Sequence, residues 1–110
     1  ERDGLQQHVE TAPALCGVHR ERSAPMFFEC LPEGIDKAAG YRELIKAIHA
    51  GDRFTVGVGD FMNDYAMIKS ADLGAAVASA LPEVREAADI VLCDNNSGAM
   101  AQLIDYIERL

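Results

Sequence analysis

The sequence predicts an α/β fold, in which helices pack on the faces of a parallel β-sheet. From residue 26 onward, short apolar segments alternate with segments that carry apolar residues at helical spacing, in the order β-α-β-α-β-α-β-α. This alternation is typical of parallel sheets, because each helix returns the chain to the edge where the next strand begins. The length of 110 residues allows one domain with a modest core.

The composition excludes several classes of protein. Apolar residues make up 49% of the chain, which argues against disorder. The net charge of −8 disfavours nucleic acid and anionic membranes as partners, because both require a basic surface. No apolar run approaches the roughly 18–20 residues of a membrane span, and we expect no signal peptide.

The cysteines indicate a reducing compartment. Cys16, Cys30 and Cys93 are widely spaced and form neither a CxxC nor a zinc pattern. Isolated cysteines in odd number favour free thiols and a cytoplasmic protein. The chain starts at Glu1 rather than at a methionine, so we expect that it begins by truncation, by processing or by choice of the expressed segment.

The first 25 residues do not continue the alternation of strands and helices. Residues 1–14 predict a helix, residues 15–21 predict a short strand, and residues 22–25 predict a linker that ends in proline. We therefore expect residues 1–25 to be the end of a separate structural unit. The parallel sheet and its helices are expected over residues 26–110.

The sheet is expected to begin with a strand at residues 26–31, stopped by the proline and glycine of residues 32–34. Asp36 predicts the N-cap of a helix, and Gly51 predicts its C-terminal cap. Residues 54–58 predict a buried strand. The apolar face of the predicted helix consists of Tyr41, Leu44, Ile45 and Ile48.

The rest of the chain predicts two more strands and three more helices. A helix is expected at residues 63–70, a strand at 73–77, a brief helix opened by Pro82, a strand at 90–93 and a turn at 94–98. The last helix is expected to place on one face Met100, Leu103, Ile104 and Ile107.

Polar residues gather where the chain leaves the strand at 54–58. Asp60, Asn63 and Asp64 come directly after this strand, at the end of a parallel sheet where sites form. Carboxylates at such a position suit a hard cation such as Mg²⁺, which takes oxygen ligands and often bridges to a phosphate. The alternative is that Asp60 fills a turn and that Asn63 or Asp64 caps the next helix.

Lys37 is the second candidate for a functional residue. It lies in the first turn of the predicted helix, where a cation opposes the helix dipole at a cost of roughly 0.3–1 kcal/mol. A bound phosphate would reverse this cost, because helix N-termini and lysine both favour anions. The alternative is a solvated lysine that tolerates the small penalty.

A lysine that opens a helix, followed by a strand that ends in Gly-Asp-x-x-Asn-Asp, resembles the haloacid dehalogenase (HAD) superfamily. The chain is most similar to the Cof-type phosphatases of that superfamily, from about residue 26 to its end. Several motifs agree with that family in their order and spacing. Together they are stronger evidence of the resemblance than a single motif would be. They are Pro-Glu-Gly-Ile-Asp-Lys-Ala at 32–38, Val-Gly-Asp-Phe-Met-Asn-Asp at 58–64, and the segments 67–74, 80–89 and 95–99.

The resemblance implies a role for each residue of the site. Lys37 corresponds to the phosphate-binding lysine, Asp60 to an acidic ligand of Mg²⁺, and Asn63 to an asparagine that contacts phosphate. Asp64 corresponds to a supporting acid that orients the lysine and the metal shell, so Asp60 and Asp64 are the expected metal-site residues, and with Lys37 they are the expected catalytic residues. The implied fold is part of a Rossmann-like core, preceded at residues 1–25 by the end of a cap domain. The implied activity is hydrolysis of small phosphomonoesters, such as sugar phosphates or phosphorylated cofactors, through an aspartyl-phosphate.

One part of the family pattern is missing. The nucleophile and the general acid of this mechanism form an Asp-x-Asp motif, and no two aspartates of the chain are separated by one residue. We therefore expect the 110-residue chain alone to be inactive. The sheet would also lack its N-terminal strands, and an exposed sheet edge favours self-association. The alternative interpretation is a non-catalytic α/β module that binds a cation or phosphate.

Overall fold

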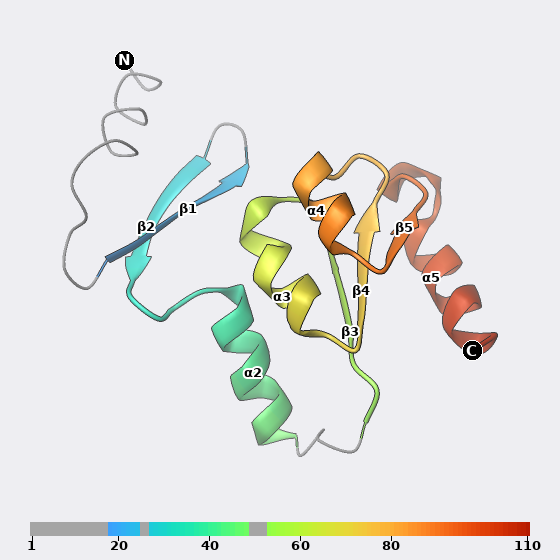
Figure 1. The fold of residues 1–110 in the computed structure, drawn as a ribbon, viewed down its shortest axis with the longest axis horizontal. Helices are drawn as coiled ribbons and strands as arrows, with labels where there is room; N and C mark the ends of the chain where they lie inside the picture. Colours follow the sequence, from blue (N-terminus) through green and yellow to red (C-terminus); the bar gives the residue numbers. More distant parts are fainter. Residues whose placement is uncertain (1–17, 25–26, 49–52) are drawn as a thin grey trace.

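The computed structural model describes residues 18–24, 27–48 and 53–110, and it contains two separate sheets (Figure 1). Strands β1 and β2 form an antiparallel pair, and strands β3, β4 and β5 form a parallel sheet in that order. The strands are β1 (Val18–Ala24), β2 (Phe27–Pro32), β3 (Val56–Gly59), β4 (Leu73–Val77) and β5 (Ile90–Leu92). The α-helices are α2 (Lys37–Ala47), α3 (Tyr65–Ser70), α4 (Pro82–Ala87) and α5 (Ala99–Glu108), and the 3-10 turns are η2 (Met62–Asp64) and η3 (Asn95–Ser97).

The parallel sheet confirms the predicted α/β class. A helix lies between β3 and β4 and another between β4 and β5, and both strand pairs are parallel. β4 is buried along its whole length, so it is the centre of the core. Helix α3 contacts β3 and β4, α4 contacts β4, and α5 contacts β5.

The strand expected at residues 26–31 is not part of this sheet. β2 pairs with β1 in antiparallel register, with His19 opposite Leu31 and Ala24 opposite Phe27. The linker predicted at residues 22–25 is therefore wrong for residues 22–24, which belong to β1. The connection between the two strands is short enough for a hairpin, whereas a parallel partner would need a crossover of a dozen or more residues.

Figure 1 shows the hairpin apart from the parallel sheet, with α2 connecting the two. β1 nevertheless contacts η2, so the hairpin reaches the loop that follows β3. The helix predicted at residues 1–14 lies outside the described residues, as does Cys16. The assignment of residues 1–25 to a cap domain stays a prediction. Within the described residues, no helix has the length and apolar character needed to cross a membrane.

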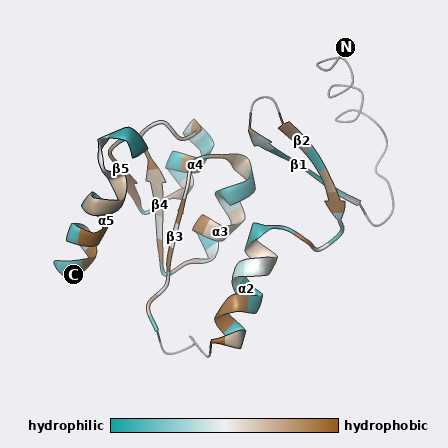
Figure 2. Cartoon of the chain, turned by 180° about the vertical axis from the view of Figure 1, so that it is seen from behind, coloured by the Kyte–Doolittle hydropathy of each residue, from teal (hydrophilic) through white to brown (hydrophobic). Residues whose placement is uncertain are grey.

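The predicted last helix is confirmed as α5, and only part of its apolar face is buried. Leu103 is buried in α5, whereas Met100 and Ile104 are 57% and 55% exposed. Figure 2 shows apolar colouring on the outer turns of both α5 and α2. Spacing identifies an apolar stripe, but the stripe is buried only where another element covers it.

Helix α2 begins as predicted and ends earlier than predicted. The Asp36 carboxylate accepts a hydrogen bond of 2.7 Å from the N–H of Ala39, which confirms the N-cap. The helix ends at Ala47 with Ile48 as its C-cap, so the prediction that Gly51 is the cap is wrong. Ile48 is about half exposed, so its side chain makes few contacts that would stabilise a further turn of the helix.

Two aspartates fix the amino ends of the parallel strands. Oδ2 of Asp72 accepts hydrogen bonds from the hydroxyl of Thr55 at 2.7 Å and from its N–H at 2.8 Å. Oδ2 of Asp89 accepts a hydrogen bond of 2.7 Å from the N–H of Gly74, and the Asp89 N–H donates to the Gly74 carbonyl at 2.8 Å. Each aspartate thus ties the start of one strand to its neighbour, which fixes the register from which the opposite end of the sheet is built.

Adding a methyl group at Gly74 should destabilise the fold. A Cβ there would lie 2.5 Å from the carbonyl oxygen and 2.7 Å from Cγ2 of the fully buried Ile68. Gly74→Ala is expected to lower the free energy of unfolding by about 1–3 kcal/mol in urea denaturation. In the control, Gly40→Ala in α2, nothing lies within 4 Å of the new Cβ, and the higher helix propensity should raise stability by about 0.5–1 kcal/mol. Equal effects would contradict this account.

The contribution of Asp72 should depend on pH. The hydrogen bonds from the Thr55 hydroxyl and N–H lower the pKa of Asp72 below its ordinary value of 3.8. The carboxylate therefore stabilises the fold at pH values above 3.8, and this stabilisation is lost as the pH falls through the lower, folded-state pKa. Asp72→Asn should lower the thermal unfolding midpoint at about pH 7 and have a smaller effect at about pH 3. A difference that is the same at both pH values would refute this.

Candidate active site

The site lies in the loop that follows β3, at the carboxyl end of the parallel sheet. β3 ends at Gly59, Asp60 is exposed, and η2 then brings the chain to Asp64, which is 5% exposed. Asn63, half-buried, lies in the same 3-10 turn. The carboxylates of Asp60 and Asp64 are therefore four residues apart in sequence but differ sharply in their exposure to water.

Asp64 connects two of the predicted site residues. Its Oδ1 accepts a hydrogen bond of 2.5 Å from Nζ of Lys37, which is 27 residues away in the sequence. Its Oδ2 accepts a hydrogen bond of 3.1 Å from the N–H of Asp60. Both oxygens of a buried carboxylate are thus engaged, and the first turn of α2 is fixed against the end of β3.

This geometry contradicts one interpretation that the sequence left open for Asp64, its role as the cap of the next helix. Asp64 occupies the N-cap position of α3, but its side chain makes no capping hydrogen bond. The carboxylate binds the lysine and the Asp60 N–H instead, so a pure capping role is wrong. Lys37 is not a freely solvated lysine either: its side chain is 51% exposed, and its ammonium group is paired with Asp64. The negative carboxylate offsets the unfavourable position of this cation at the helix N-terminus.

Gly59 makes this arrangement possible. A Cβ at Gly59 would lie 2.3 Å from Cβ and 2.5 Å from Oδ2 of Asp64. A side chain at this position would therefore occupy the space that the Asp64 carboxylate fills. A glycine in a strand allows another group to approach the backbone closely, and at Gly59 that group is the carboxylate of Asp64.

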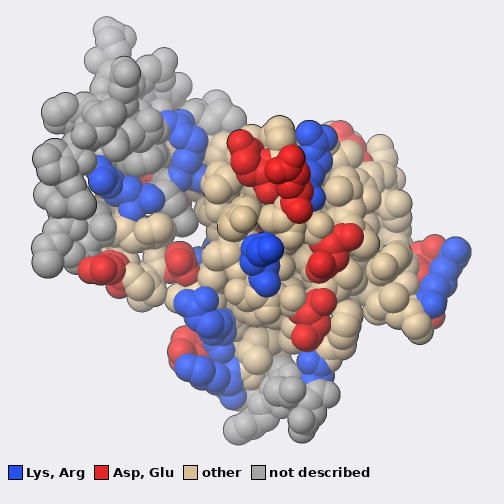
Figure 3. Space-filling view, viewed as in Figure 1, with Lys and Arg blue, Asp and Glu red and all other residues tan. Residues whose placement is uncertain are grey.

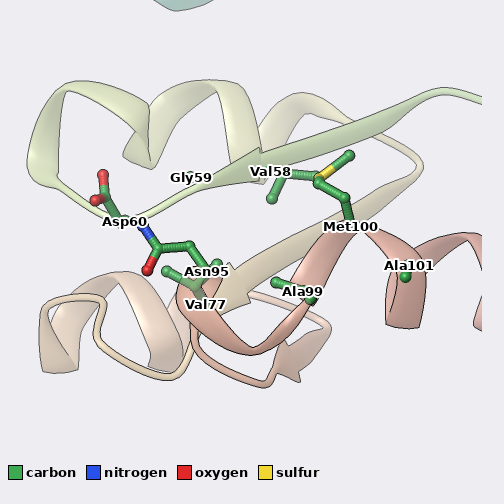
Figure 4. Close-up of a pocket in the computed structure, with 9 residues that line it drawn as sticks. Val58, Gly59, Asp60, Val77, Asn95, Ala99, Met100 and Ala101 are labelled. Carbon is green, nitrogen blue, oxygen red and sulfur yellow. The ribbon is translucent and has the colours of Figure 1, made fainter.

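Asp60 lies at the rim of a pocket of about 310 Å³. In Figure 4, the Asp60 carboxylate points away from the apolar lining, and the Asn95 side chain extends toward the point where Asp60 leaves β3. Asn95 belongs to the motif at 95–99, but nothing in the sequence assigned it a role in the site. The signal was its position in the turn after β5, because the carboxyl ends of parallel strands share one edge. The pocket is lined by Val58, Gly59, Asp60, Val77, Asn95, Gly98, Ala99, Met100 and Ala101.

The oxygen donors at this site are of the chemical type that a hard cation binds. Asp60 offers a carboxylate that no hydrogen bond or ion pair among the described residues engages, and oxygen is the ligand that Mg²⁺ prefers. Asp64 is already committed to Lys37 and to the Asp60 N–H. The described residues contain no cluster of three or more His, Cys, Asp or Glu side chains that could hold a metal. Further ligands would therefore be water, substrate or groups outside the described residues.

The charged residues form no single patch on the visible face. Figure 3 shows acidic and basic side chains interspersed over the described part of the molecule. This distribution provides no extended basic surface on that face, in keeping with the charge of −8.

The fold and the position of its polar residues define an α/β protein with a site at the carboxyl end of a parallel sheet. A family model described as haloacid dehalogenase-like hydrolase matches residues 1–104. The chain belongs to this family, as the resemblance of its motifs predicted.

Known phosphatases are among the similar proteins. The chain is 36% identical over 77 residues to phosphoglycolate phosphatase 2 of Saccharolobus solfataricus, an alignment that covers 70% of the chain and 33% of the relative. It is 34% identical over 84 residues to the 5-amino-6-(5-phospho-D-ribitylamino)uracil phosphatase YcsE of Bacillus subtilis, covering 76% and 34%.

A solved structure is similar over most of the chain. The haloacid dehalogenase-like hydrolase from Bacteroides thetaiotaomicron is 36% identical with a TM-score of 0.71, covering 82% of this chain and 34% of that one. The chain thus spans about a third of the length of these relatives.

A double-mutant cycle should detect the coupling between Lys37 and Asp64. We expect Lys37→Met and Asp64→Asn to be less than additive, with a coupling of roughly 0.5–3 kcal/mol in the free energy of unfolding. The control is the pair Lys46–Glu43, 3.3 Å apart with both side chains largely exposed, which should show almost no coupling. If the two cycles gave the same value, the hydrogen bond would not hold α2 to the loop.

Proposed function

We propose that the chain is part of a magnesium-dependent HAD-type phosphatase that hydrolyses small phosphomonoesters, such as sugar phosphates or phosphorylated cofactors. The observation that supports this most is the hydrogen-bonded arrangement of Lys37, Asp64 and Asp60 at the carboxyl end of β3. Membership of the hydrolase family and the similarity to phosphatases support the same activity.

Each residue of the site has a role in this proposal. Lys37 binds the transferred phosphate and neutralises part of its charge, and Asn63 contacts a phosphate oxygen. Asp60 is the ligand of Mg²⁺, which would supply further positive charge toward the phosphate oxygens when bound. Asp64 supports the metal shell from behind, by holding Lys37 and the backbone of Asp60 in position. Fixed positive charge of this kind is the main contribution of proteins to phosphoryl transfer.

The attacking group comes, in this proposal, from another part of a longer protein. The mechanism needs a nucleophilic aspartate that forms an aspartyl-phosphate and a second aspartate that moves a proton. The chain has no Asp-x-Asp motif and spans about a third of its relatives. We therefore infer that the 110-residue chain alone is inactive, and that residues 1–25 end a cap domain of the longer protein.

The names of the relatives support the proposed class of substrate. The names of the two phosphatases specify phosphoglycolate and a phosphorylated ribitylaminouracil, both of them small phosphomonoesters. The free thiols of Cys30 and Cys93 are in keeping with a cytoplasmic location, which we include in the proposal.

The second candidate is a non-catalytic module that binds a cation or phosphate. The missing Asp-x-Asp motif favours it, because Lys37 and Asp60 can bind charge without a nucleophile. The coding sequence upstream of Glu1 separates the two functions. An apolar strand that ends in Asp-x-Asp supports the phosphatase, whereas a reading frame that begins at Glu1 supports the binding module.

Two substitutions in the longer protein should reduce turnover of a small phosphomonoester. Lys37→Ala is expected to lower kcat/KM by roughly 10²–10³-fold, in line with the removal of one charge-stabilising donor. Asp60→Asn should weaken Mg²⁺ binding and raise the Mg²⁺ concentration needed for half-maximal rate. Lys46→Ala, near the opposite end of α2, is the control and should leave kcat/KM unchanged. Full activity of either site variant would exclude the role assigned to that residue.

Self-association is a further expectation for the isolated chain. In the described sheet β3 is an end strand, and an end strand can pair with a second copy. Light scattering should show a mass that increases with concentration; a monomer at all concentrations would contradict this.

A further inference from the structure

The two faces of β3 are covered unequally. Gly57 faces α3, because a Cβ at this position would lie 3.2 Å from the carbonyl oxygen of Met67. Side chains alternate across a strand, so Val56 and Val58 point to the opposite face. Both valines are half-buried, although the neighbouring strand β4 is buried along its whole length. One face of β3 is therefore closed by α3, and the other face is partly open.

The open face of β3 forms one wall of the pocket of about 310 Å³, and α5 forms another. Val58 and Met100 both line this groove, and Met100 is 57% exposed. In Figure 4 their side chains extend into the same space between β3 and α5, whereas the Asp60 carboxylate points away from it. Apart from Asp60 and Asn95 at its rim, the groove is lined by glycine and apolar side chains, so it suits an apolar occupant.

The backbone of β3 also has a free edge. Among the described strands, β3 pairs with β4 alone. The Thr55 carbonyl accepts a hydrogen bond of 3.0 Å from the N–H of Leu73, so this peptide group turns toward β4. Successive peptide groups turn to opposite sides of a strand, and the N–H groups of Val56 and Val58 therefore turn toward the free edge. A further strand would pair with these groups and place alternate side chains in the groove.

We propose that the groove between β3 and α5 is the docking surface for an apolar strand from the upstream part of the longer protein, an inference that rests on the proposed function. The chain spans about a third of its relatives, so most of such a protein lies outside it. The proposed mechanism requires that part to bring an aspartate close to Lys37 and Asp60. A strand parallel to β3 ends at the same edge of the sheet as Asp60, and it meets this requirement.

A second copy of the chain meets this requirement less well. Two copies related by a two-fold axis would pair their β3 strands in antiparallel register. The Asp60 loops of the two copies would then lie at opposite ends of the pair, and neither copy would supply a nucleophile to the other. Such pairing accounts for self-association of the isolated chain, whereas in the longer protein the upstream strand occupies the same edge.

The first test compares Met100→Lys in the 110-residue chain and in the longer protein. Met100 is exposed in the chain, so the lysine should leave the thermal unfolding midpoint of the chain unchanged. In the longer protein the lysine would be buried against the docked strand, and the midpoint should fall by about 4 °C or more. Val91→Lys is the matched control, because Val91 is 50% exposed on β5 and does not line the groove. Its effect should be the same in both proteins.

The second test needs no substitution and compares amide hydrogen exchange in the two proteins. The chain is measured at a concentration at which light scattering shows a monomer. The N–H groups of Val56 and Val58 should exchange at least about 10-fold more slowly in the longer protein, because the docked strand accepts their hydrogen bonds. The N–H of Gly57, which turns toward β4, is the internal control and should change less.

The outcomes separate this inference from the proposed function. If Val56 and Val58 gain no protection, or if a folded Met100→Lys variant has equal effects in the two proteins, the docking surface is overturned. Phosphatase activity of the longer protein would still support the proposed function in that case. If both tests succeed but the longer protein hydrolyses no phosphomonoester, the docking surface stands and the proposed function fails. A reading frame that begins at Glu1 would overturn both.

Discussion

The carboxylate of Asp64 is the interaction on which the site depends. It accepts one hydrogen bond from the lysine of α2 and another from the backbone at the end of β3, so two segments that are distant in the sequence meet on a single side chain. Burial makes this effective, because a carboxylate shielded from water interacts more strongly with a nearby ammonium group. Without it, Lys37 and Asp60 would belong to unconnected surface elements.

Small residues of the sheet create the space for this carboxylate. Gly59 leaves room for Asp64 at the end of β3, and Gly74 lets α3 approach β4 at Ile68. The two contacts place the helix and the loop before it close against the strands. A side chain at Gly59 would displace the Asp64 carboxylate, and one at Gly74 would displace Ile68 of α3. The absence of a side chain therefore matters both for the geometry of the site and for the packing of the sheet.

Local patterns in the sequence predicted most of this architecture. The capping role of Asp36, the strand at residues 73–77 and the helix opened by Pro82 depend on neighbouring residues, and all three are confirmed. The pairing of β2 was wrong because strand character does not specify a partner, and the exposure of Met100 was not predicted because periodicity does not specify what covers a face. The grouping of Lys37 with Asp60 and Asp64 came from a family resemblance. The position of Asn95 at the pocket was not predicted, because it depends on two crossovers of the chain.

The order of the strands places the candidate site at an edge of the described sheet. β3 is the end strand of the described sheet, and it also carries the functional loop at its carboxyl end. Any strand that pairs with the free edge of β3 would therefore lie next to the loop that carries Asp60. The candidate site is therefore bordered by whatever covers this edge, and a partner that pairs with β3 would also change the exposure of Asp60 to water.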